Sequence, residues 1–319
     1  MTDREQACYA QHFGLWAIKP QVAMEMAAAY NSGQLPRRER PTGERRQTPV
    51  AKQGDLPKRV YMAGDDPDFD APLYTVDETG VGFVAIDGQI TKGRSSLGGT
   101  SNVQTRQALR AAEADSDVRG IMVMVDSPGG TVAGTKPMSD EVARIAKSGR
   151  VPIVAHVEDA MHSAALWTGV QAQRVTASAT SEIGCIGVLC VVHDYSKMYE
   201  NKGIKVHALG TGEMKGAFTP GTEVTQQMLD ELKERIEAIN QFFLIAVKVG
   251  RNMPIEQVRA LADGRDWLAA EAKERGLIDE VMSQDDAVRT FRQMIRQRGN
   301  DVQAPARRIS RAAALAEMS

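Results

Sequence analysis

The chain has 319 residues, of which 42% are hydrophobic and 25% are charged, and its formal net charge is −2. This composition is that of an ordinary globular protein, and the length allows one large domain or two small ones. The near-neutral charge balance argues against a nucleic-acid or anionic-membrane partner, because such partners usually demand a basic excess.

The cysteines and histidines show no spacing that is typical of a metal site or a disulfide framework. Three cysteines and five histidines are scattered without a CxxC pair, an HExxH motif or paired Cys/His spacing, so no metal or other cofactor is expected. This usage suits a reducing, cytoplasmic compartment. The chain has no run of about 18 apolar residues that would predict a membrane span. Its amino terminus also lacks the basic start and apolar core of a secretion signal.

The amino-terminal part of the chain predicts little packed structure. Residues 13–30 favour a short helix after Pro20, with apolar residues at helical spacing. From residue 31 to about 72, Gly, Pro, Arg, Asp and Gln dominate and apolar periodicity is lost, which indicates a flexible linker. We expect four segments: an N-terminal helical segment over 1–33, a flexible linker over 34–76, a folded domain over 77–298 and a disordered tail over 299–319.

The folded body alternates apolar strands with helices. Because the strands are near-continuous apolar runs, the pattern predicts an α/β fold with a parallel sheet covered on both faces. The predicted strands are 81–86, 120–125, 151–155, 174–177, 186–192, 204–209 and 277–281. The predicted helices are 101–114, 135–147, one starting near 163, 196–202, 224–249, 254–262, 268–275 and 284–297.

Residues 126–130 (DSPGG) end the second of these strands with a pair of glycines. Glycine lets backbone N–H groups turn outward with no side chain in the way. Such donors can form an oxyanion hole, which contributes on the order of 10²- to 10³-fold in rate. A tight strand-to-helix turn explains the same residues without any catalytic role.

Residues 162–167 (HSAALW) place a serine, Ser163, at the first turn of a predicted helix. The first N–H groups of a helix have no intrahelical acceptor, and the helix dipole favours negative charge there. This position suits a nucleophile whose attack creates an oxyanion, and the alanines behind it leave room for a substrate backbone. The alternative is that Ser163 only caps the helix, as serines routinely do.

A nucleophilic serine needs a general base. His162 is adjacent in sequence, so its ring points away from Ser163 and a structural role is expected. Lys215 lies among glycines in residues 210–216 (GTGEMKG). A lysine acts as a base only when burial away from anions favours its neutral form, and an ordinary solvent-facing lysine fits the same loop. Three further histidines remain formal alternatives: His156, His193 and His207.

Taken together, the motifs resemble the signal peptide peptidase A family of serine–lysine proteases, over about residues 77–290. The resemblance implies a Clp/crotonase-like α/β core of repeated ββα units, with a parallel sheet flanked by helices. A C-terminal helical part and a disordered N-terminal arm would complete the chain. The blocks that carry the resemblance are VAIDGQITKG (84–93), VRGIMVMVDSPGG (118–130), HSAALW (162–167), GCIGV (184–188), GTGEMKGAFTP (210–220) and DWLAAEAKERGLIDEV (266–281).

The resemblance implies a role for several residues in an endopeptidase site. The family nucleophile falls on Ser163 and the general base on Lys215, at the spacing of the family pattern. The oxyanion donors would be the N–H groups of Gly130 and Ala164. The domain over 77–298 would then be the peptidase domain, and no cofactor is implied.

Two residues depart from the family pattern. Relatives usually have Gly-Ser-Ile-Gly-Val where this chain has Cys185 in residues 184–188, and that serine orients the lysine. Cysteine is a poorer hydrogen-bond partner, so Ser181 or a backbone carbonyl would take over this role. Leu166 stands where an aromatic residue is common, which we expect to alter only the packing of the substrate pocket.

The opening FGLWAIKP (residues 13–20), followed by a helix and a disordered arm, resembles the capsid-maturation proteases of tailed phages and prophages. This branch implies scaffold, portal or capsid proteins as substrates, and the tail over 299–319 would be the start of a scaffold segment. It also implies a homo-oligomer, with active sites that neighbouring subunits shape and a dyad that two subunits can share. The location would be the bacterial cytoplasm or the interior of phage proheads, without a membrane anchor.

Four alternatives remain open at this point. The chain could be a cellular signal-peptide-peptidase-like protease that degrades peptides, or a crotonase-type acyl-CoA enzyme with a carboxylate base. It could be a Clp-type Ser-His-Asp peptidase. It could also be a catalytically silent assembly protein, with Cys185 as a sign of decay.

Overall fold

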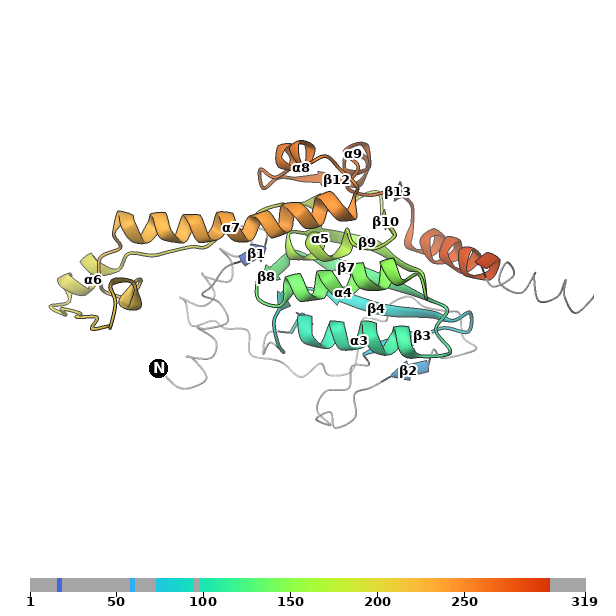
Figure 1. The fold of residues 1–319 in the computed structure, drawn as a ribbon, viewed down its shortest axis with the longest axis horizontal. Coiled ribbons are helices and arrows are strands. Elements are labelled where there is room, and N and C mark those ends of the chain that lie inside the picture. Colours follow the sequence, from blue (N-terminus) through green and yellow to red (C-terminus); the bar gives the residue numbers. More distant parts are fainter. Residues whose placement is uncertain (1–15, 19–57, 61–72, 95–97, 299–319) are drawn as a thin grey trace, which may run out of the picture.

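The structure is a computed structural model that describes residues 16–18, 58–60, 73–94 and 98–298 (Figure 1). The helix predicted within 13–30, most of the predicted linker and the tail over 299–319 lie outside the described residues. Residues 58–60 and 74–76, which fall in the predicted linker, form two short strands, β2 (Lys58–Val60) and β3 (Tyr74–Val76). These strands join the main sheet next to β4.

The architecture is mixed α/β, with a mostly parallel sheet flanked by helices. Its centre is formed by β4 (Val81–Asp87), β7 (Gly120–Ser127) and β9 (Ile153–His162), which pair in parallel. Within the described part of the chain, this sheet has nine strands, with β12-β11-β9-β7-β4-β3-β2 as its main path. The remaining strands are β10 (Arg174–Ala177), β11 (Glu182–Gly184), β12 (Asp266–Leu268) and β13 (Glu280–Val281).

The central strands are buried on both faces, as their continuous apolar runs predict. Ile121 and Val123 of β7 belong to the large core cluster, while Met122 and Met124 between them belong to a second cluster on the opposite face. This alternation follows from the two-residue period of a strand. The helices that contribute to the large cluster are α3 (Asn102–Ala114), α4 (Thr135–Ser148), α5 (Ala164–Gly169), α7 (Gln226–Gly250), α8 (Ile255–Leu261) and α9 (Ala269–Glu274).

The last helix, over residues 284–298, covers the second face of the sheet. Phe291 and Ile295 pack over Gly120, where a Cβ atom would lie within 2.8 Å of both side chains. Arg292 of this helix also forms an ion pair with the buried carboxylate of Asp77, at 2.7 Å. The helix is therefore held by apolar packing and by charged contacts of its arginines.

A small second sheet lies beside the end of β7. It consists of β6 (Thr100–Ser101), β5 (Ile90–Thr91), β8 (Gly129–Thr131) and β1 (Trp16–Ile18), in the order β1-β8-β5-β6. Gly130 pairs with Ile90 on one side and with Ala17 on the other. A Cβ atom at Gly130 would lie 1.8 Å from the carbonyl oxygen of Ile90, so no other residue fits this strand without a backbone shift.

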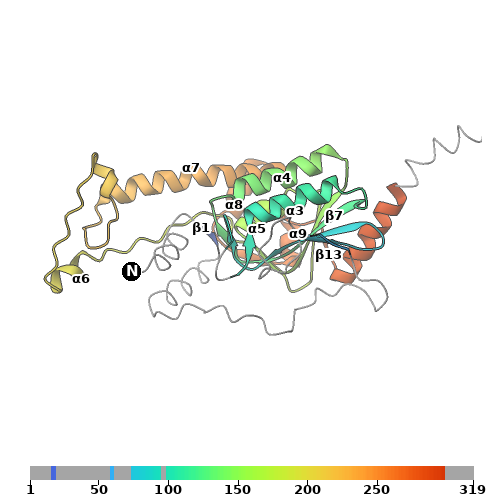
Figure 2. The same ribbon diagram turned by 90° about the horizontal axis from the view of Figure 1, so that it is seen from below.

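One part of the prediction is wrong: no strands form over 186–192 or 204–209. Residues 188–225, which we term the arm, contain α6 (Ser196–Asn201) and a single 3₁₀ turn, η1 (Glu213–Gly216), joined by irregular chain. Figures 1 and 2 show the arm at the end of α7 that is far from α5. An apolar run forms a strand only beside a partner strand, and within the described part of the chain these runs form only a single bridge, at Leu189. Val191, Ile204 and Leu209 are accordingly 52%, 49% and 96% exposed.

The long helix α7 links the arm to the body of the protein. Thr225 begins it by accepting a hydrogen bond from the N–H of Met228, as a helix N-cap does. Of its apolar residues, Phe243 and Val247 near the carboxyl end are fully buried, while the residues of the first turns are exposed or half-buried. Half of the helix thus projects from the core. Among the described residues, no helix is long and apolar enough to cross a membrane.

Candidate active site

Ser163 lies at the sharp turn between β9 and α5, under the surface of the body. Its backbone has φ 51° and ψ −112°, a conformation that residues other than glycine rarely adopt. Such strain costs on the order of 1–3 kcal/mol and persists where the surroundings enforce it. Here the N–H of Ser163 donates to the carbonyl of Gly184 at 2.9 Å, and its carbonyl accepts from the N–H of Trp167 at 2.8 Å.

The hydroxyl of Ser163 does not cap the helix, although the residue occupies the N-cap position. Its Oγ donates instead to the carbonyl oxygen of Gly187 at 3.3 Å, a long and therefore weak hydrogen bond. The side chain is fully buried. The helix-cap explanation is thus excluded, and the strained strand-to-helix turn is the arrangement that holds a nucleophile in the α/β-hydrolases.

The two predicted oxyanion donors come from elements that pack against each other. Gly130 lies in β8, and α5, which begins with Ala164, packs against β8. Ala164 is the first residue of α5, where backbone N–H groups have no acceptor within the helix. Ser127 holds the turn that leads from β7 into β8. Its Oγ donates to the carbonyl of Gly88 at 2.6 Å and accepts from the N–H of Gly129 at 3.1 Å.

The edge of the sheet beside β8 carries several carboxylates. Burial raises the pKa of Asp126, and the nearby charges of Asp159, Asp87 and Glu158 raise it further. Asp87 ends β4, Asp126 is the last residue but one of β7, and Glu158 and Asp159 lie in the second half of β9. This part of the sheet is therefore acidic.

Lys215 does not meet Ser163 within one chain. It lies in η1 of the arm, its N–H donates to the carbonyl of Gly212 at 3.0 Å, and its side chain is exposed. The arm lies beyond the projecting half of α7, away from α5 (Figures 1 and 2). A single chain thus assembles the serine and the glycine strand but not the lysine.

The two residues considered for orienting the lysine are both fixed by the body. Cys185 is 5% exposed, has φ 56°, and donates its N–H to the carbonyl of Arg265 at 2.7 Å. The hydroxyl of Ser181 is fully buried and contacts the carbonyl oxygens of Val157 and Glu158 at 3.1 and 2.7 Å. The Ser181 hydroxyl is therefore hydrogen-bonded to the backbone of β9.

The alternative histidine bases lie in two environments. Burial lowers the pKa of His156 to about 4, and its Nδ1 lies 2.8 Å from the hydroxyl of Thr176. His156 is thus a neutral residue of the core. His193 and His207 are exposed and belong to the arm, like Lys215.

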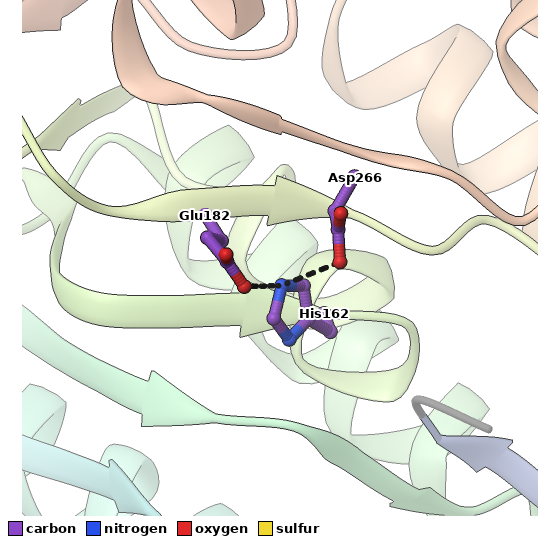
Figure 3. Close-up of side chains that lie close together, drawn as sticks. All are labelled: His162, Glu182 and Asp266. Carbon is purple, nitrogen blue, oxygen red and sulfur yellow. Dashed lines mark ion pairs between the residues drawn. The ribbon is translucent and has the colours of Figure 1, made fainter. Parts of the chain in front are cut away.

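His162 is the feature that the sequence did not reveal. Its ring is buried, and it faces Glu182 and Asp266 (Figure 3). The three residues are distant in sequence and share no motif, so only the pairing of β9, β11 and β12 brings them together.

Comparison with known proteins gives a family match over part of the chain. Residues 145–298, which include Ser163 and Lys215, match peptidase family S49. The mostly parallel sheet with flanking helices is the fold that the family resemblance predicts, so the fold prediction is confirmed.

Cellular and phage proteases match the chain at similar identity. Protease 4 of Haemophilus influenzae is 27% identical over 220 residues, which cover 68% of this chain and 35% of that protein. Capsid assembly protease C of Escherichia phage lambda is 28% identical over 184 residues, which cover 58% and 41%. The chloroplastic serine protease SPPA of Arabidopsis thaliana is 26% identical over 195 residues, which cover 60% and 28%. The chain spans less than two thirds of the length of each of these relatives.

Proposed function

We propose that residues 77–298 form a serine endopeptidase in which Ser163 is the nucleophile and Lys215 the general base. The observation that carries this proposal is the enforced, strained turn at Ser163, beside a strand whose Gly130 admits no side chain. The similarity of residues 145–298 to a peptidase family supports the same reaction. The N–H groups of Gly130 and Ala164 would hold the oxyanion.

Lys215 would come from a second copy of the chain. In one chain the arm exposes apolar side chains without a partner strand or helix to cover them, Leu209 at 96% above all. Contact with another copy would bury these side chains and bring Lys215 of one copy to Ser163 of the next. It would also remove water from the amine, which favours the uncharged form that a base needs.

The reaction would proceed through an acyl-enzyme. The uncharged amine takes the proton of the Ser163 hydroxyl as the oxygen attacks the scissile carbonyl, and the two backbone N–H groups stabilise the oxyanion. The ammonium then returns the proton to the leaving amine. A water molecule, deprotonated by the same lysine, attacks the ester and releases the acid product.

The substrate would bind as an extended strand along β8. In the structure the edge of β8 is paired in antiparallel fashion with β1, with Ala17 opposite Gly130. A sheet edge that accepts one strand can accept another, and such pairing places a peptide backbone next to the strand that it joins. The substrate strand would therefore take the place of β1 beside the oxyanion donors.

The substrates would be capsid, scaffold or portal proteins in a phage head, as the similarity to capsid assembly protease C suggests. The second candidate is peptide degradation in a cell, which the equal similarity to Protease 4 supports. The two are separated by incubating the chain with candidate scaffold protein and with unstructured peptides, and by mapping the cuts by mass spectrometry. Discrete cuts in the scaffold protein favour the first, and cleavage of peptides alone favours the second.

Mixing two inactive variants tests both the dyad and its origin. Ser163→Ala and Lys215→Ala should each lose at least about 10³-fold in kcat. A mixture of the two, assembled together from unfolded chains, should regain up to about a quarter of wild-type activity, since about one neighbouring pair in four combines an intact serine with an intact lysine. A mixture as inactive as its components would show that the dyad is not shared.

Two further variants separate this mechanism from the histidine alternative. His193→Ala and His207→Ala should keep activity if Lys215 is the base. Loss of activity in either one, with Lys215→Ala still active, would instead identify a Ser-His peptidase. Turnover of acyl-CoA thioesters that survives in Lys215→Ala would identify the crotonase-type reaction.

A further inference from the structure

Three side chains of metal-ligand type lie together at the end of β9, outside the groups assigned to peptide cleavage. They are His162, Glu182 and Asp266, and their ligand atoms all lie within 4.8 Å of one another. Nε2 of His162 is 3.6 Å from Oε2 of Glu182 and 3.5 Å from Oδ2 of Asp266. Figure 3 shows both carboxylates turned toward the imidazole, that of Glu182 from β11 and that of Asp266 from β12.

The register of three strands creates this cluster. Gly184 on β11 pairs with His162 on β9 and with Asp266 on β12, so these three residues form one row across the sheet. Residues in one row send their side chains to the same face. The central residue of the row has no side chain, and Glu182 lies two residues earlier on the same face of β11. The imidazole and the two carboxylates therefore meet over the glycine.

The charge and spacing of the cluster suit a divalent cation. With a neutral imidazole the two carboxylates carry a charge of −2 in a small space, which a bound cation would offset. The two N–O distances are longer than the roughly 2.7–2.9 Å of a good charge-assisted hydrogen bond. They are close to the separation of about 3.3–3.5 Å between two ligands of a tetrahedral ion with bonds of about 2.0–2.2 Å.

We propose that His162, Glu182 and Asp266 bind a divalent transition-metal ion, with Zn²⁺ as the best fit. Imidazole nitrogen and carboxylate oxygen are both zinc ligands, whereas Mg²⁺ and Ca²⁺ prefer oxygen alone. The His162 side chain is 3% exposed, but those of Asp266 and Glu182 are 29% and 47% exposed. The ion can therefore enter from solvent, and water can complete its coordination.

The bound ion would brace the turn that holds the nucleophile. His162 directly precedes Ser163, and the carbonyl of Gly184 accepts the N–H of Ser163. An ion that links β9, β11 and β12 would fix both sides of this hydrogen bond. This role does not depend on Lys215 or on the identity of the substrate, so it stands apart from the proposed function.

The test measures metal binding directly on the full-length chain after removal of metals with a chelator. Zn²⁺ affinity is measured by competition with a chromophoric chelator, and Co²⁺ supplies a visible spectrum that reports tetrahedral coordination. One Zn²⁺ should bind per chain and raise Tm, while Mg²⁺ and Ca²⁺ should not compete. His162→Gln should weaken Zn²⁺ binding at least about 100-fold, and Glu182→Gln or Asp266→Asn at least about tenfold.

Matched variants keep the proposal falsifiable if His162→Gln fails to fold. Glu182 is the most exposed of the three residues, so Glu182→Gln is the variant whose fold is least at risk. His193→Gln in the arm and Glu256→Gln in α8 serve as controls and should bind Zn²⁺ like the native chain. The proposal is overturned if the native chain binds no Zn²⁺, or if Glu182→Gln and Asp266→Asn bind it unchanged. It is also overturned if Cys185→Ser or Cys190→Ser abolishes binding while His162→Gln does not.

Discussion

Ser163 and Lys215 lie in regions that differ in how much of their structure one chain supplies. Around Ser163 the neighbouring strands and helices come from the same chain. The side chain is fully buried, and backbone hydrogen bonds enforce its conformation. Around Lys215 the chain is largely irregular and leaves apolar side chains exposed. One chain therefore completes the packing around Ser163 but leaves the apolar side chains of the arm exposed, and under the proposed function a second copy would cover them.

The largest effect is expected near Ser163, from Gly130→Ala in β8. The added Cβ would lie 1.8 Å from the carbonyl oxygen of Ile90, so β8 must move and carry its N–H away from the oxyanion. We expect kcat/KM to fall about 10²- to 10³-fold, measured with a fluorogenic peptide. Gly93→Ala is the matched control, because a Cβ there meets nothing within 4 Å. Equal activity of the two variants would contradict the assignment of Gly130.

In the arm, Leu209→Asp should weaken the association of chains without weakening the fold of each chain. A charge at this fully exposed apolar position costs little in one chain but is costly at a subunit contact. We expect dissociation in light-scattering measurements and a loss of about 10- to 100-fold in activity, with Tm of the body unchanged. Lys202→Asp, at an exposed polar position of the arm, should leave both properties intact. An oligomer that persists in Leu209→Asp would show that the arm is not the contact.

A smaller effect of opposite sign, a gain in activity, is expected when the pairing of β1 with the edge of β8 is weakened. Ala17→Pro removes a backbone N–H and disfavours the pairing of β1 with β8. If β1 competes with substrate, kcat/KM should rise about threefold to tenfold, since a larger fraction of molecules would be open. An unchanged or lower kcat/KM would show that β1 supports β8 instead of blocking it.

The smallest effect on catalysis is expected from Asp77→Asn, which tests the stability of the body alone. Burial acts to raise the pKa of Asp77, but hydrogen bonds from the Val81 N–H, Thr79 and Arg292 outweigh it and hold this pKa below 3.8. The stabilisation is therefore present above the ordinary carboxyl range and is lost as the pH falls through the lowered value. At pH 7 the variant should lose about 2 kcal/mol in urea unfolding.

The pH dependence provides the control for that measurement. Because protonation removes the same charge as the substitution, the difference between Asp77→Asn and the native chain should shrink near pH 3. Asp286→Asn, which removes an exposed carboxylate of the last helix, should cost much less at pH 7. A difference that stays constant with pH would show that the Asp77 charge contributes nothing to stability.

The sequence predicts the body well because its signals are local. The strand over 174–177 agrees at both ends with β10, and the helices predicted over 101–114 and 135–147 agree with α3 and α4 to within one residue. Apolar periodicity decides these elements, since their partners lie in the same chain. The runs over 186–192 and 204–209 carry the same signal but form only a single bridge, at Leu189, within the described part of the chain, so the prediction fails there.

In the candidate site, too, the features set by local sequence are predictable and those set by distant partners are not. Ser163 and Gly130 are recognisable because a strand end, a glycine pair and a helix start are local patterns. The meeting of His162 with Asp266 depends on the register of three strands, which no local pattern records. Under the proposed function, the position of Lys215 relative to Ser163 would depend on an assembly, which local patterns in the sequence of one chain do not encode.

The contact between α5 and α7 has a mechanical consequence. Trp167, in the helix that begins directly after Ser163, stacks on Phe243 of α7 with ring centroids 4.8 Å apart and planes 6° from parallel. The 25 residues of α7 form a rod of roughly 37 Å that has this stack near one end and the arm at the other. Under the proposed function, a neighbouring molecule that contacted the arm would apply force to this rod, and the aromatic stack would pass the displacement to the helix that follows Ser163.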